Sequence, residues 1–133
     1  MKVGFIGLGN MGQAISGRIQ DAGYDLIVYN RTRSKAAELE KKGAKVADSI
    51  AEACEGRDIV FTMLADDKAL TQVTEGGLLD TLVKGGTHVP MGTHSVNALL
   101  ALKEKHDAAG HVFIPAPVLG RPDAAAAGSV APG

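Results

Sequence analysis

The chain has 133 residues, of which 45% are hydrophobic and 22% charged. This composition fits one globular domain with an apolar core. The 14 Lys and Arg residues balance 15 Asp and Glu residues, and a net charge of −1 provides no field that would gather nucleic acid or an anionic membrane. The single cysteine, Cys54, excludes an internal disulfide and favours a reducing compartment, for which we expect the cytoplasm. No run of about 18 apolar residues is available to span a membrane.

Short apolar runs alternate with helical patterns along the chain, which is typical of βαβ units on a parallel sheet. We predict an α/β fold with a doubly wound parallel sheet of about six strands and three layers, filling residues 1–133 as one domain. The predicted strands are residues 3–7, 25–30, 45–46, 58–64, 87–91 and 111–118. The predicted helices are residues 11–22, 34–43 with Ser34 as N-cap, a short helix ending at Cys54 and capped by Asp48 or Ser49, 67–73, a further stretch to 83, 95–109, and a short turn opened by Pro122.

A glycine motif, G-x-G-x-x-G, joins the first strand to the first helix. In this pattern Gly7 turns the chain out of the strand, Gly9 leaves room for a pyrophosphate, and Gly12 lets the helix pack closely on the sheet. A helix N-terminus offers free N–H groups and a partial positive charge to phosphates. The residues between the glycines are Leu8, Asn10 and Met11, and the last two would donate backbone hydrogen bonds to the pyrophosphate. A purely structural turn is the alternative; the strand–turn–helix context favours a Rossmann dinucleotide-binding domain.

The end of the second strand distinguishes the two nicotinamide dinucleotides. Proteins that bind NAD usually place an Asp or Glu there to hold the ribose 2′-hydroxyl. This chain has Asn30, Arg31, Thr32 and Arg33 instead. A guanidinium suits a 2′-phosphate because it forms two parallel charge-assisted hydrogen bonds, and Asn30 and Thr32 can add neutral donors. The sequence therefore predicts NADP as the cofactor, with NAD less favoured, against the alternative of a solvated loop that carries two arginines.

Five segments in register resemble one enzyme family: GFIGLGNMG, VYNRT, MLADD, MGTHSV and APVLG. Together they resemble the N-terminal domain of the β-hydroxyacid dehydrogenases, which include 3-hydroxyisobutyrate dehydrogenase and glyoxylate/succinic semialdehyde reductases and are related to 6-phosphogluconate dehydrogenase. The resemblance implies an NADP-dependent oxidoreductase that acts on a small carboxylate substrate. It further implies that Leu64, Ala65 and Thr93 contact the cofactor near the nicotinamide end. Helix capping by Thr93 is the alternative.

The resemblance also locates the substrate segment and two departures from the family. Leu119 and Gly120 match the family's A-P-V-S-G segment, but the family usually has Ser in place of Leu119 and Gly in place of Arg121. Arg121 is a candidate for binding the substrate carboxylate or an ordinary surface arginine. The family's catalytic lysine lies in a later segment, beyond Gly133, together with the helical domain that completes the substrate pocket and forms the dimer. The resemblance thus implies no catalytic residue in this chain, an inactive isolated segment and a homo-oligomeric full-length protein.

The remaining titratable residues give weaker signals. The histidines lack metal-ligand spacing, so we predict no metal site; His106 and His111 are expected at the surface, and His94 as a loop residue with a weaker case for contacting substrate. Cys54 is expected to be buried, and Lys68, Lys84 and Lys103 solvated. Two alternatives stay open: a non-catalytic NADP-binding module or partner subunit, and a methyltransferase that uses S-adenosylmethionine. The basic cluster after the second strand argues against the methyltransferase.

Overall fold

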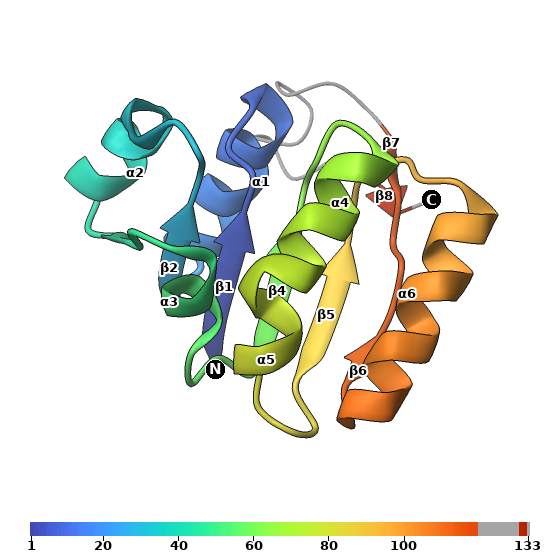
Figure 1. Ribbon diagram of the computed structural model, residues 1–133. Coiled ribbons are helices and arrows are strands. Elements are labelled where there is room, and N and C mark those ends of the chain that lie inside the picture. The colour runs from blue at the N-terminus through green and yellow to red at the C-terminus, as the bar shows by residue number, and fades with distance from the viewer. Residues whose placement is uncertain (120–130, 133) are drawn as a thin grey trace.

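A six-stranded parallel sheet forms the centre of the computed structural model, which describes residues 1–119 and 131–132. The strand order is β3-β2-β1-β4-β5-β6 (Figure 1), so the chain reverses its direction of winding between the adjacent strands β1 and β4. This is the doubly wound Rossmann order, and the predicted fold class is confirmed. The strands are β1 (Lys2–Ile6), β2 (Asp25–Tyr29), β3 (Lys45–Val46), β4 (Ile59–Thr62), β5 (Thr87–Pro90) and β6 (Val112–Phe113).

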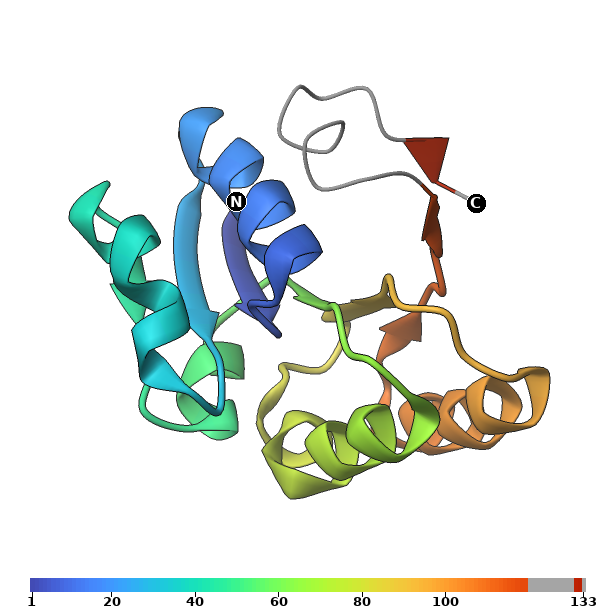
Figure 2. The same ribbon diagram turned by 90° about the horizontal axis from the view of Figure 1, so that it is seen from above.

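Helices cover both faces of the sheet and give the three predicted layers. Figure 2 shows α1 and α2 on one face and α3, α4, α5 and α6 on the other. Within the described residues, no helix has the length and apolar character needed to cross a membrane. The helices are α1 (Asn10–Asp21), the 3₁₀ turn η1 (Arg33–Ala36), α2 (Ala37–Lys41), α3 (Ile50–Cys54), α4 (Asp67–Val73), the π-turn η2 (Thr74–Leu78), α5 (Leu79–Thr81) and α6 (Val96–Ala109).

Alternate residues of the central strands supply two separate apolar cores. Phe5 and Val28 pack toward α1 and α2, whereas Ile6 and Ile27 pack toward α3 and the α4–α5 segment. A strand that buries both faces must be apolar at nearly every position, which is why the strand runs are so easily recognised in the sequence. Cys54 is fully buried in the second core, as predicted, and burial raises the pKa of its thiol to about 12.

Three predicted boundaries change in the structure. The second helix does not begin on a Ser34 cap, because Thr32 O accepts a hydrogen bond from Lys35 N and a 3₁₀ turn starts at Arg33. The last strand, predicted over 111–118, ends at Phe113, because Pro115 and Pro117 have no N–H for a regular ladder. Beyond them β7 (Val118–Leu119) pairs with β8 (Ala131–Pro132) in a separate antiparallel ribbon. The helical turn predicted at Pro122 lies outside the described residues.

Three buried histidines form a hydrogen-bonded chain beneath α6. Thr62 Oγ1 lies 2.9 Å from His88 Nε2, His88 Nδ1 lies 3.0 Å from His106 Nε2, and His106 Nδ1 lies 2.9 Å from His111 Nδ1. This series of hydrogen bonds ends at His111, whose Nε2 donates to Leu82 O at 2.9 Å. Because a carbonyl oxygen only accepts, Nε2 of His111 carries a proton at this end of the series.

The predicted surface positions of His106 and His111 are therefore wrong. Their exposed fractions are 0% and 7%, and the ring of Phe113 stacks on His106 with centroids 4.8 Å apart. One signal was available in the sequence: His106 follows Leu102 by four residues and so shares the buried face of its helix. His111 carried no such signal, because its burial depends on contact with residue 82.

Candidate functional site

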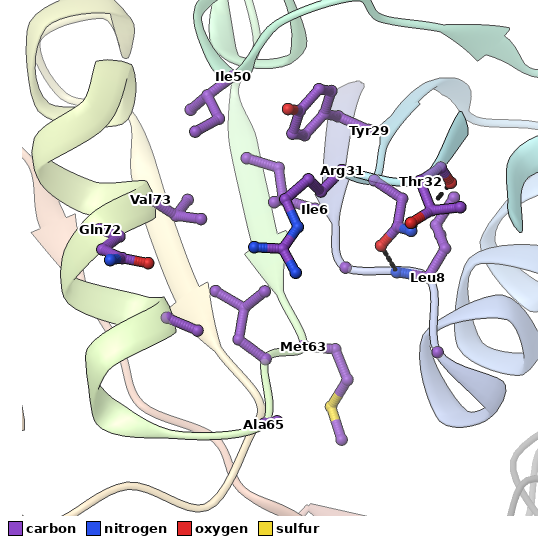
Figure 3. Close-up of a pocket in the computed structure, with 15 residues that line it drawn as sticks. Ile6, Leu8, Tyr29, Arg31, Thr32, Ile50, Met63, Ala65, Gln72 and Val73 are labelled. Atoms are coloured by element: carbon purple, nitrogen blue, oxygen red, sulfur yellow. Dashed lines mark hydrogen bonds between the residues drawn. The ribbon is translucent and has the colours of Figure 1, made fainter.

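A pocket opens at the carboxyl ends of β1 and β4, where the strand order reverses. Crevices at this point are the usual ligand sites of open α/β sheets. The pocket has a volume of about 440 Å³ and lies between the loop after β2 and helix α4 (Figure 3). Its lining residues come from the ends of β1 and β2, the glycine turn, the loops after β2 and β4, the start of α3, and α4: Ile6, Gly7, Leu8, Gly9, Tyr29, Asn30, Arg31, Thr32, Ile50, Met63, Leu64, Ala65, Ala69, Gln72 and Val73.

The three motif glycines have three different surroundings. Gly7 has φ of +104°, and a Cβ there would lie 2.2 Å from Met63 O. A Cβ on Gly12 would lie 2.0 Å from Gly7 O, because α1 packs directly on the turn. A Cβ on Gly9 would meet no atom within 4 Å. The fold therefore requires Gly7 and Gly12, whereas Gly9 keeps open a space on the pocket side.

Helix α1 begins without a side-chain cap. Ser49, Asp66 and Ser95 accept hydrogen bonds from the first turns of α3, α4 and α6, which settles the predicted cap of α3 in favour of Ser49. The N-cap of α1 is Gly9, which has no side chain, and its first turn contains no acidic residue. The first N–H groups of α1, on Asn10 and Met11, thus face the glycine turn without a capping acceptor, and a helix end in this state attracts anions.

Asn30 fastens the glycine turn to the end of β2. Its Oδ1 accepts a hydrogen bond of 2.9 Å from Leu8 N, and its Nδ2 donates one of 3.0 Å to Thr32 O (Figure 3). This structural role was not predicted, since the sequence suggested only a donor for a ligand. The amide occupies the position where an acidic residue would otherwise select NAD.

The two arginines that follow β2 have different partners. Arg33 forms an ion pair with Asp48, with Nη1 and Oδ1 2.6 Å apart, and a longer one of 3.7 Å with Glu40. The exposed side chain of Arg31 instead extends into the pocket toward α4 (Figure 3) and has no ion pair with another described residue. Among the residues that line the pocket in the described part of the chain, none is acidic. On the β2 side of the pocket, the positive charge of Arg31 is thus not neutralised by a described acidic residue.

The structure brings together most, but not all, of the predicted site residues. Of these, Gly7, Leu8, Gly9, Asn30, Arg31, Thr32, Leu64 and Ala65 line the pocket. Asn10, Met11 and Gly12 lie beside it in the first turn of α1. Thr93 is exposed in the loop after β5, outside the pocket lining, and the cap of α6 is Ser95. The side chain of Leu119, and all of Gly120 and Arg121, lie outside what the structure describes.

Several pocket residues were not predicted from the sequence. Gln72 and Val73 belong to α4, which lies across the pocket from Arg31, and Ile50 begins α3 at the edge near Tyr29 (Figure 3). They have ordinary helical patterns and only tertiary packing brings them to the pocket. The lysines suggested as solvated are exposed, which confirms that prediction for Lys68 and Lys84, and likewise for Lys103.

A carboxylate links the loops that follow β4 and β5. Asp67 Oδ1 accepts a hydrogen bond of 3.1 Å from His94 Nδ1 and one of 3.0 Å from Ser95 N. Hydrogen bonding from Ser95, and then from His94, holds the pKa of Asp67 below its ordinary value. His94 is therefore not simply a loop residue, since its side chain is only 1% exposed.

A sequence model of the NAD binding domain of 6-phosphogluconate dehydrogenase matches residues 2–133. The chain belongs to this family. Its glycine turn, its strand order and the crevice where that order reverses are features that Rossmann dinucleotide-binding domains share.

Curated relatives of this family are named as oxidoreductases. The chain is 50% identical over 128 residues to the uncharacterized oxidoreductase YfjR of Bacillus subtilis, which covers 95% of this chain and 45% of that protein. It is 36% identical over 122 residues to glyoxylate/succinic semialdehyde reductase 1 of Arabidopsis thaliana, covering 90% of this chain and 42% of the relative. The chain thus spans less than half the length of these relatives.

Solved structures of the same type superpose closely. A 3-hydroxyisobutyrate dehydrogenase of Mycobacterium tuberculosis matches with a TM-score of 0.94 and 26% identity, over 98% of this chain and 45% of that one. A reductive aminase of Aspergillus terreus, solved with NADPH and ethyl levulinate, matches with a TM-score of 0.82 and 25% identity, over 92% and 42% of the two chains. The resemblance inferred from the five sequence segments is confirmed.

Proposed function

We propose that residues 1–133 bind NADP(H) and form the cofactor domain of an oxidoreductase that transfers hydride between NADP(H) and a small hydroxyacid or semialdehyde. The observation that carries the choice of NADP is Arg31, an exposed guanidinium directed into a pocket with no acidic lining residue in the described chain. A 2′-phosphate would find there a bidentate donor and no repelling carboxylate. The NADPH complex of the Aspergillus terreus reductive aminase supports this choice by analogy.

The pocket suggests how the cofactor's parts would lie. The pyrophosphate would face the uncapped start of α1, where Asn10 and Met11 offer backbone N–H groups. The adenosine would lie on the β2 side, with its 2′-phosphate at Arg31 and Thr32. The nicotinamide would extend past Leu64 and Ala65 toward the loop that carries Thr93.

The proposed chemistry requires a proton donor in addition to the cofactor. The cofactor carries the hydride, and carbonyl reduction needs in addition an acid that protonates the substrate oxygen. We propose that residues 1–133 hold and orient the cofactor and that a second domain supplies the acid. The greater length of the relatives leaves room for such a domain. We also propose that the whole protein is a homo-oligomer. Leu119, Gly120 and Arg121 remain the proposed contacts to a carboxylate substrate, and the cytoplasm the proposed location.

Replacing Arg31 by alanine tests the choice of NADP. Loss of a bidentate contact to the 2′-phosphate should weaken NADPH binding by about 1.5–3 kcal/mol, roughly 10- to 150-fold, and leave NADH binding nearly unchanged. The wild-type protein and Arg31→Ala are each titrated with NADPH and with NADH. The fluorescence of the reduced nicotinamide then gives the four dissociation constants. The chain contains no Trp, so the signal comes from the cofactor itself.

Arg33→Ala is the matched control for this experiment. It removes the same charge two residues along the chain, from a side chain already paired with Asp48 and Glu40. We expect a smaller loss of NADPH affinity than in Arg31→Ala. If the two variants lose the same affinity, the contribution is general electrostatic attraction, and a specific phosphate contact at Arg31 is refuted.

A further inference from the structure

The loops after β4 and β5 are joined at one carboxylate. Asp67, the first residue of α4, accepts from His94 Nδ1 and from the backbone of Ser95, the N-cap of α6. Asp66 is already engaged as the N-cap of α4, where it accepts from Ala69 N at 2.8 Å. The two neighbouring carboxylates therefore have separate roles: Asp66 caps the start of α4, and Asp67 links the loops after β4 and β5 at the carboxyl edge of the sheet.

The position of the His94 ring is tightly defined. Because an ionised carboxylate only accepts, Nδ1 of His94 donates to Asp67. Nε2 is buried and has no hydrogen-bond partner in the described structure. It faces Gly92, since a Cβ on that residue would lie 2.8 Å from Nε2 and 2.5 Å from Leu64 O. The His94 ring thus lies between the carboxyl ends of β4 and β5. The hydrogen bond from Nδ1 to Asp67 and the packing against Gly92 hold it there.

Thr93 lies directly between these fixed points. Gly92 contacts Leu64 and the His94 ring on one side, and Asp67 holds His94 and Ser95 on the other. Thr93 itself is exposed, and no hydrogen bond to its side chain is found among the described residues. Its location is therefore set by its neighbours, and loss of the His94 contact would remove one of two bonds that hold the loop to α4.

We propose that His94 is a positioning residue: its hydrogen bond to Asp67 holds Thr93 at the nicotinamide end of the crevice and thereby sets the affinity for the nicotinamide half of the cofactor. This inference rests on the proposed binding of NADP(H). It assigns to the Asp67–His94 pair no contact with the cofactor or the substrate. The adenosine half, bound on the opposite side of the glycine turn, should be insensitive to the pair.

Two ligands separate the halves of the site. NADPH contains both halves, whereas adenosine 2′,5′-bisphosphate contains the adenosine and its 2′-phosphate without the nicotinamide. We expect His94→Ala to weaken NADPH binding by about tenfold, equivalent to about 1.4 kcal/mol, and to leave the affinity for adenosine 2′,5′-bisphosphate within about twofold of wild type. Calorimetric titration measures both ligands in the same way, and urea unfolding of each variant checks that the fold is retained.

Two amide variants identify which nitrogen matters. The amide nitrogen of asparagine occupies roughly the place of Nδ1, and that of glutamine the place of Nε2. His94→Asn should restore the hydrogen bond to Asp67 and the wild-type affinity for NADPH, whereas His94→Gln should behave as His94→Ala does. Because both amides are polar and of similar size, this comparison holds even where the alanine variant fails to fold.

The possible outcomes are distinguishable. Equal losses for both ligands, or rescue by glutamine and not by asparagine, would overturn the positioning role of the Asp67 contact. An unchanged NADPH affinity in folded His94→Ala would overturn it as well. Failure of wild type to bind either ligand would instead refute the proposed function on which the inference rests.

Discussion

Replacing Gly9 by alanine is expected to weaken NADPH binding strongly while leaving the fold intact. Gly9 has φ of −66° and ψ of −175°, a conformation open to alanine, and a Cβ there meets no protein atom within 4 Å. Loss of a glycine N-cap and reduced entropy of the unfolded chain are opposing terms of up to about 1 kcal/mol each. The added methyl would occupy the space where the pyrophosphate must approach the backbone, so we expect NADPH affinity to fall at least about tenfold.

Gly12→Ala is the comparison that makes this result specific. Its Cβ would lie 2.0 Å from Gly7 O, a backbone atom that cannot move without disturbing the turn. Overpacking of this kind costs about 1–3 kcal/mol or more, so this variant should lose stability as well as binding. Urea unfolding and NADPH titration of both variants measure the two effects separately. A Gly9→Ala protein that binds NADPH as wild type does would show that no phosphate approaches this turn.

Acidification below pH 6.5 is expected to destabilise the protein well before its carboxylates titrate. Burial, and then the charges of neighbouring histidines, lowers the pKa of His88 well below 6.5 and that of His106 to about 4. Asp107 acts in the opposite direction on the pKa of His106, the charge of His111 lowers the pKa of both rings, and the charge of His94 lowers that of His88. Both folded-state pKa values lie below the unfolded value, so the unfolded chain binds more protons as the pH falls.

The sign follows from this difference. Stability from these histidines is fully present above pH 6.5 and is lost as the pH falls toward 4, by about 1.4 kcal/mol per pH unit for each histidine that titrates only in the unfolded chain. Asp25, whose pKa is lowered first of all by its hydrogen bond from Arg57, adds a loss only near and below its unfolded value of 3.8. The interval between pH 7.5 and 5.0 therefore isolates the histidines.

Urea unfolding at pH 7.5 and 5.0 measures this loss. His106→Gln should reduce the pH dependence by about one proton, although breaking the hydrogen-bonded chain also lowers its stability at pH 7.5. Lys105→Gln, an exposed neighbour on the same helix, should retain the wild-type pH dependence. Equal unfolding free energies of wild type at the two pH values would mean that the histidines are not held neutral in the folded protein.

Local chemistry made most of the fold predictable. Strands such as β1 and β4 are apolar because both faces of a parallel sheet are covered, and Gly7 and Gly12 are required by a turn within a few residues of them. The cap of α3, Ser49, which was one of two residues suggested for it, is a local signal of the same kind. Where a boundary was wrong, as at the end of β6, two prolines limited the strand more strongly than its apolar pattern favoured it.

Features that depend on distant contacts could not be predicted in the same way. His88, His106 and His111 form one chain only because β5, α6 and the following turn meet in space. The bond from Asn30 to Leu8 and the link from His94 to Asp67 likewise join residues 22 and 27 positions apart. The sequence identified the glycine turn and the loop after β2 that line the pocket, while the helical residues Ile50, Gln72 and Val73 come to it only through tertiary packing.

The affinity of the wild-type chain for the two reduced cofactors tests the central claim most directly. The purified 133-residue protein is titrated with NADPH and with NADH at the same ionic strength, and the fluorescence of the reduced nicotinamide gives both dissociation constants. Arg31 at the end of β2 predicts saturable binding of NADPH at least about tenfold tighter than that of NADH. Equal affinities would contradict the choice of NADP, and no binding of either cofactor would contradict the proposed function itself.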